Sequence, residues 1–151
     1  MSNRGLSLLG DAANIDTLYL EHSQVDADGI PALEQLPKLK TLSLTPKRHS
    51  VALVALRNLN ELQHLAIFDS TEVTVFLRHL PKLKSLLLRE PGEIATELAA
   101  LKTLRWLIVL TKEPNPQRLR AYRRAAPSCN VRSYTSVTEA RRAFRRLAEN
   151  F

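Results

Sequence analysis

Residues 80–88 read Leu80-Pro81-Lys82-Leu83-Lys84-Ser85-Leu86-Leu87-Leu88, and copies of their Leu-x-x-Leu-x-Leu core recur before and after them at nearly fixed spacing. The central leucines of five copies are separated by 24, 23, 21 and 21 residues, and they are Leu18, Leu42, Leu65, Leu86 and Leu107. Such a period is typical of stacked repeats in which each repeat is one supersecondary unit. The sequence therefore predicts a repeat architecture.

Each Leu-x-Leu core predicts a short parallel strand whose leucines point into the core while the residue between them points out. A weaker copy, Ala126-x-x-Cys129-x-Val131, predicts a sixth strand in which Cys129 takes a leucine position as a small buried hydrophobe. The segments between strands are expected to run along the opposite side, mostly as short helices. The predicted strands lie near residues 18–20, 42–44, 65–67, 86–88, 107–109 and 129–132.

The predicted fold is α/β, a right-handed solenoid with a concave parallel sheet of five to six short strands and helices on the convex side. A chain of 151 residues has room for one domain, with the solenoid over residues 1–134 and an Arg-rich amphipathic helix over residues 135–151. The capping box Ser136-Val137-Thr138-Glu139 indicates where this helix begins. We expect the helix to cap the open end of the core; a contact of its arginine face with a membrane or a nucleic acid is the alternative.

Two stretches carry a resemblance to a known family. The run Leu18-Tyr19-Leu20-x-x-Ser23-x-Val25-x-Ala27-x-Gly29-Ile30 is similar to the repeat of short bacterial-type leucine-rich repeat (LRR) proteins, and Leu119 through Val131 resembles their closing repeat. The asparagine that many such repeats place after the strand is missing here. The resemblance implies binding through the concave sheet, with no common ligand and no chemistry.

The positive charge is confined to the C-terminal region. Residues 1–113 contain 13 Lys and Arg against 13 Asp and Glu, whereas residues 114–151 contain nine arginines against Glu139 and Glu149. A localised basic block favours an acidic protein, a nucleic acid or an anionic lipid as partner. The predicted basic face consists of Arg118, Arg120, Arg123, Arg124, Arg132, Arg141, Arg142, Arg145 and Arg146.

An apolar patch is predicted on the concave surface of repeats three to five, because nothing in a stack of repeats requires large apolar residues at outward positions. Its members are Phe68, Leu87, Trp106, Ile108 and Leu110, with His64, Arg89 and Arg105 at its rim. Such a patch is typical of a protein interface with an aromatic anchor. The alternative is that the tail helix or a second copy of the chain covers it.

The leading hypothesis is a non-catalytic protein-interaction module, a scaffold that holds a protein partner against this patch. RNA binding through the basic C-terminal region is the alternative, although few aromatic residues accompany the arginines.

Catalysis is not expected. Ser85 and His64 are predicted neighbours, but the next residue in their column is Thr41 and not a carboxylate. The four histidines have no metal-ligand spacing, and no phosphate loop is present, so no cofactor is predicted.

The single cysteine, the lack of a signal peptide and the lack of a long apolar run favour a cytoplasmic protein.

Overall fold

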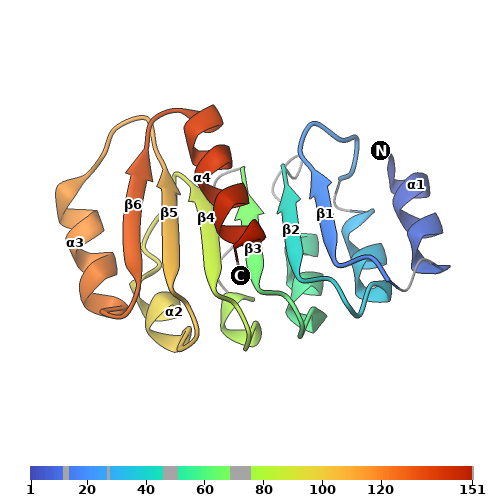
Figure 1. Cartoon of the computed structure of the whole chain (residues 1–151), viewed down its shortest axis with the longest axis horizontal. Coiled ribbons are helices and arrows are strands. Elements are labelled where there is room, and N and C mark those ends of the chain that lie inside the picture. The colour runs from blue at the N-terminus through green and yellow to red at the C-terminus, as the bar shows by residue number, and fades with distance from the viewer. Residues whose placement is uncertain (12–13, 27, 46–50, 69–75, 151) are drawn as a thin grey trace.

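Six short strands form one parallel sheet in chain order, β1-β2-β3-β4-β5-β6 (Figure 1). The computed structural model describes residues 1–11, 14–26, 28–45, 51–68 and 76–150. The α/β class and the parallel sheet agree with the sequence-based prediction, and each strand overlaps its predicted range. The strands are β1 (Thr17–Leu20), β2 (Thr41–Leu44), β3 (His64–Ile67), β4 (Ser85–Arg89), β5 (Trp106–Leu110) and β6 (Asn130–Tyr134).

The central leucines of the sequence copies lie side by side across the sheet. Leu42 is in register with Leu18 on one side and with Leu65 on the other, and the same column continues through Leu86 and Leu107. These side chains point into one buried apolar core. The side chains two positions later in each strand point into the same core. The fixed spacing therefore stacks equivalent residues at the roughly 4.8 Å distance between strands.

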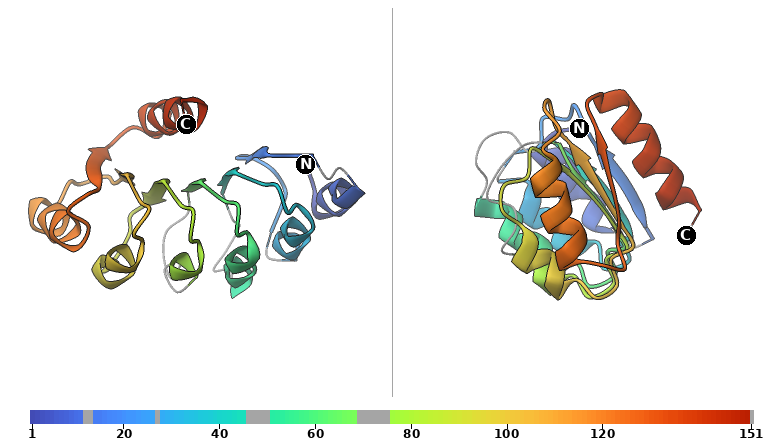
Figure 2. Two further views of the ribbon diagram at one scale, coloured as in Figure 1. Left: turned by 60° about the horizontal axis from the view of Figure 1, so that its bottom comes forward. Right: turned by 90° about the vertical axis from the view of Figure 1, so that its left-hand side faces the viewer.

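The connections between strands lie along one face of the sheet, here called the helical face (Figure 2). Several are 3₁₀ rather than α-helical, as is common for short connectors. In η2, Pro31 stands in the first turn, where its missing N–H removes no helical hydrogen bond. The connecting and N-terminal elements are α1 (Asn3–Ser7), η1 (Leu8–Asp11), η2 (Ile30–Gln35), η3 (Val51–Asn58), η4 (Leu77–His79), α2 (Ala95–Ala100) and α3 (Pro116–Ala125).

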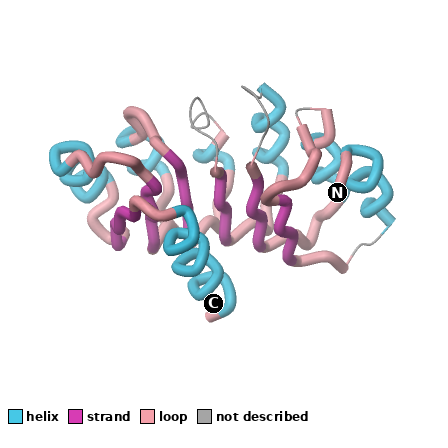
Figure 3. The backbone as a smooth tube through the Cα atoms, turned by 90° about the horizontal axis from the view of Figure 1, so that it is seen from above, coloured by secondary structure: helices cyan, strands magenta, loops and turns pink. Residues whose placement is uncertain are grey.

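The last helix, α4 (Val137–Glu149), lies on the opposite face of the sheet, here called the inner face (Figures 2 and 3). The Ser136 side chain caps it by accepting a hydrogen bond from the Glu139 amide at 3.4 Å. Its buried residues Ala140 and Phe144 belong to a second apolar cluster with strands β3 to β5. The expectation that this helix caps the open end of the core is therefore wrong.

The position of α4 has a physical reason. Strands β3 to β5 carry large apolar side chains on both of their faces, so the inner face would expose an unusually apolar surface without a cover. The apolar stripe of α4 removes this surface from water. In the part of the chain that the structure describes, no helix is long and apolar enough to cross a membrane.

Candidate functional site

The predicted apolar patch is buried beneath α4. Leu87 is 0% exposed and Ile108 is 1% exposed, and Phe68 and Leu110 are each 3% exposed. All four pack in one cluster with Phe144 of α4. The expectation of an open concave patch is therefore wrong, and the alternative that the tail helix covers it agrees with the structure.

The rim residues of this patch have separate surroundings. Trp106 is half-buried, and the Arg132 guanidinium lies 4.9 Å from the centre of its ring. Arg89 is half-buried and donates from Nη1 to the Phe68 carbonyl at 3.5 Å, whereas Arg105 is exposed. Of the predicted partner-binding residues, Arg105 is thus exposed, and Trp106 and Arg89 are partly accessible.

His64 and Ser85 are neighbours in the register of β3 and β4, as predicted, and both side chains are buried. Neither His64 Nδ1 nor Ser85 Oγ has a hydrogen-bond partner. Burial, together with the nearby positive charge of Lys84, lowers the pKa of His64 to about 4. The imidazole is therefore neutral at pH 7, and the pair lacks the serine–histidine hydrogen bond that an activated nucleophile requires.

Cys129 is a free, buried cysteine. Burial raises its pKa to about 11, so the thiol stays protonated at neutral pH and is a poor nucleophile. Among the described residues, no group of three or more His, Cys, Asp or Glu side chains could hold a metal ion.

Glu21, at the end of β1, connects the first repeat to the last helix. Its carboxylate accepts a hydrogen bond from Ser43 Oγ at 2.5 Å and one from Arg145 Nη2 at 3.0 Å. Arg141 Nε lies 4.0 Å away, which is too far for a hydrogen bond. The two guanidinium groups also lie over aromatic rings, Arg145 over Tyr19 at 4.6 Å and Arg141 over Phe68 at 4.8 Å. No local pattern in the sequence predicts this contact.

The nine arginines of the predicted basic face lie on two sides of the sheet. Arg118, Arg120, Arg123 and Arg124 belong to α3 on the helical face, whereas the other five belong to β6 and α4 (Figure 2). Two of the α3 arginines bond to the backbone, Arg118 to the Pro91 carbonyl and Arg123 to the Val131 carbonyl. The structure therefore does not join the nine into one surface.

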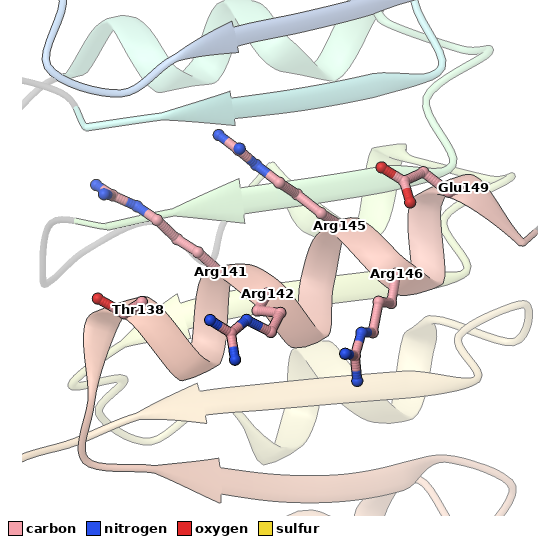
Figure 4. A pocket seen from close by; sticks show the side chains of 6 residues that line it. All are labelled: Thr138, Arg141, Arg142, Arg145, Arg146 and Glu149. Atoms are coloured by element: carbon pink, nitrogen blue, oxygen red, sulfur yellow. The ribbon is translucent and has the colours of Figure 1, made fainter.

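The arginines of α4 point to two sides of the helix axis. Arg141 and Arg145 point toward β3 and β2, whereas Arg142 and Arg146 point toward β5 (Figure 4). Arg142 and Arg146 are exposed, and within the described ranges neither side chain has an ion pair. A shallow surface depression of about 400 Å³ lies between these four side chains, and Thr138 and Glu149 complete its lining.

A second basic surface lies at the edge of the sheet where strands β3 to β5 begin. It is a groove of about 490 Å³, here called the edge groove. The residues that line it are Gln63, Lys82, Lys84, Lys102, Thr103 and Arg105. Arg105 is predicted from the sequence as a rim residue of the apolar patch, and no sequence pattern predicts the groove.

No protein-family model matches the sequence, and no curated protein matches it significantly.

Proposed function

We propose that the chain is a short bacterial-type leucine-rich repeat protein folded as a right-handed solenoid. The regular Leu-x-x-Leu-x-Leu period, the parallel strands in chain order and the helical connections on one face support this assignment. We also propose that it is non-catalytic, because the buried His64 and Ser85 have neither a mutual hydrogen bond nor a carboxylate beside them in their column. A single cysteine is consistent with a cytoplasmic location.

We propose that this module binds single-stranded RNA through a surface formed by Arg132, Arg142 and Arg146, here called the arginine surface. The observation that carries the proposal is the unequal pairing of the α4 arginines. Glu21 lies beside Arg141 and Arg145, whereas Arg142 and Arg146 are exposed on the other side of the helix. Unpaired guanidinium groups bind phosphate oxygens through two parallel hydrogen bonds.

Trp106 favours RNA over an acidic protein as the partner. The sequence alone assigned this residue to an apolar patch, but its side chain is only half-buried and lies against the exposed Arg132. An aromatic ring beside arginines offers a base a stacking surface, and stacking contributes about 1–3 kcal/mol for each base. Carboxylates of an acidic protein would use only the arginines.

A direct test measures binding of a fluorescent oligouridylate of about 12 nucleotides over a salt series that begins near 50 mM. We expect affinity to fall steeply with salt. The double variant R142Q/R146Q should lower the slope of log K against log salt by about 1.4, because each phosphate contact in a single strand contributes about 0.7. No binding at the lowest salt would refute the proposal.

Two controls make this test specific. R57Q/K112Q removes the same charge from exposed positions outside the arginine surface, so its salt slope should equal that of the wild-type protein. Polyglutamate serves as a competitor. If polyglutamate at equal charge concentration displaces the RNA completely, the partner is an acidic protein and not RNA.

A second candidate is the protein-interaction module expected from the sequence. The observation that favours it is that the inner face of β3 to β5 already holds an amphipathic helix through Ala140 and Phe144. A partner helix could take the same place if α4 moved away. A synthetic peptide of residues 136–150 added to the F144D variant tests this idea, and saturable binding to the variant but not to the wild-type protein is the expected result.

A further inference from the structure

The edge groove is built on residues that immediately precede the strands. The amide of Gln63 donates to the Lys40 carbonyl, that of Lys84 to the Gln63 carbonyl and that of Arg105 to the Lys84 carbonyl, at 2.8, 2.7 and 2.8 Å. These backbone hydrogen bonds extend the sheet ladder by one residue beyond the strands. The side chains of Gln63, Lys84 and Arg105 therefore lie at a fixed spacing along one edge of the sheet, about 4.8 Å from strand to strand.

The charge of the edge groove is of one sign. Four of its six lining side chains are cationic, and none of the described lining residues is a carboxylate. This concentration is not visible in the composition, because residues 1–113 are neutral as a whole. Single-signed charge in a concave site attracts an anionic ligand more strongly than the same charge spread evenly.

The side chains of the groove differ in their availability to a ligand. The Thr103 hydroxyl contacts the carbonyls of Pro81 and Leu83 at 3.0 and 2.9 Å, so it holds the loop in place. Lys82 pairs with Glu61 at 2.5 Å, but both side chains are about half exposed. Exposed pairs of this kind contribute about 0–1 kcal/mol, so a phosphate can replace the carboxylate.

Lys84 and Arg105 are the central cations of the groove. Neither has an ion pair within the described ranges. The positive charge of Lys84 contributes to the lowered pKa of the adjacent His64, and that imidazole is neutral. Since none of the ion pairs among the described residues involves Lys84 or Arg105, both cations are available to an anion.

The groove and the arginine surface are linked in the chain through Trp106. Arg105 directly precedes Trp106, and the Trp106 ring lies against Arg132. We infer that the edge groove binds the phosphodiester backbone of the same RNA strand, which runs from Lys84 and Arg105 past Trp106 to the arginine surface. This inference rests on the proposed function.

The test uses the full-length K84Q/R105Q variant and the same oligouridylate of about 12 nucleotides. We expect weaker binding and a salt slope lower by about 1.4, since two phosphate contacts are lost. The matched control R57Q/K112Q should keep the wild-type slope. A parallel oligothymidylate series tells whether the groove distinguishes RNA from DNA; equal loss with both probes agrees with backbone recognition.

A wild-type slope in K84Q/R105Q, together with a lowered slope in R142Q/R146Q, would overturn the groove inference and leave the proposed function standing. Absence of binding by the wild-type protein would overturn both. If K84Q/R105Q loses its fold by circular dichroism, the exposed pair K82Q/K102Q replaces it. That pair should lower the salt slope as well, and an unchanged slope again overturns the inference.

Discussion

Arg145 donates a hydrogen bond to the Glu21 carboxylate at 3.0 Å, although the two residues are 124 positions apart in the sequence. Glu21 belongs to the first repeat and Arg145 to the last helix. The Glu21 side chain is only 7% exposed, whereas that of Arg145 is 47% exposed. This contact joins the first repeat to α4 across the inner face of the sheet.

Removal of the Glu21 charge should weaken the contact between the first repeat and α4. E21Q keeps the shape of the side chain and removes the charge that Arg145 and Ser43 contact, so we expect the free energy of unfolding to fall by about 1 kcal/mol. Urea denaturation measures the change. R142Q changes the same helix without breaking an ion pair of the described residues and should lie within about 0.5 kcal/mol of the wild-type value. Equal effects of the two variants would contradict the stabilising role of Glu21.

Phe144 is expected to be the main anchor of α4. It is 1% exposed and belongs to the apolar cluster of the inner face. F144A should lower the free energy of unfolding by about 3 kcal/mol, and amide hydrogen exchange in β4 and β5 should become faster as α4 detaches. The control V137A changes an exposed residue of the same helix and should have little effect. Unchanged exchange in F144A would mean that other contacts hold the helix.

His64 should make the stability depend on pH. Its pKa is about 4 in the folded protein and about 6.5 when exposed, because burial and Lys84 disfavour the charged form. Between these two pH values the unfolded state therefore binds the proton more readily than the folded state. The contribution of His64 to the free energy of unfolding is fully present above pH 6.5 and is lost as the pH falls toward 4. The free energy of unfolding can fall by about 3 kcal/mol in this way, because each unit of pKa difference corresponds to about 1.4 kcal/mol.

Urea denaturation at pH 7 and pH 5 measures this dependence. H64L should remove most of it, because leucine does not titrate. H79Q replaces an exposed histidine and should keep the wild-type dependence. The same pH dependence in H64L would assign the effect to other groups.

The strands could be predicted from the sequence because one local pattern determines them. The leucines of each copy must face the core, and the constant period places Leu86 beside Leu65 and Leu107. The end of β6 extends past the predicted residue 132 because Leu110 pairs with Tyr134, which belongs to no leucine pattern. Such pairs follow from the register between neighbouring strands, and the local sequence contains no signal for them.

The site was less predictable because it depends on where α4 lies. The stripe of Ala140 and Phe144 fits any apolar surface, and both the end of the core and the inner face were available to it. Periodicity identified Leu87 and Ile108 as outward residues but contained no information about their cover. The contact of Glu21 with Arg145 follows from that cover, so it could not be predicted before α4 was placed.

Trp106 offers a spectroscopic test of the proposed RNA surface, because it is the only tryptophan of the chain. The centre of its half-buried ring lies 4.9 Å from the Arg132 guanidinium, so a base that stacks on the ring changes its surroundings directly. We expect oligouridylate to quench the tryptophan fluorescence with the same midpoint as the binding measured by anisotropy.

Substitution of Trp106 should separate stacking from charge. W106A should weaken RNA binding by about 1–3 kcal/mol without changing the salt slope, since a base contact is lost and no phosphate contact is. W106F keeps an aromatic face and should recover most of the affinity. Equal affinities of W106A and the wild-type protein would show that the bound strand does not pass this residue, and the path from the edge groove to the arginine surface would then have to be abandoned.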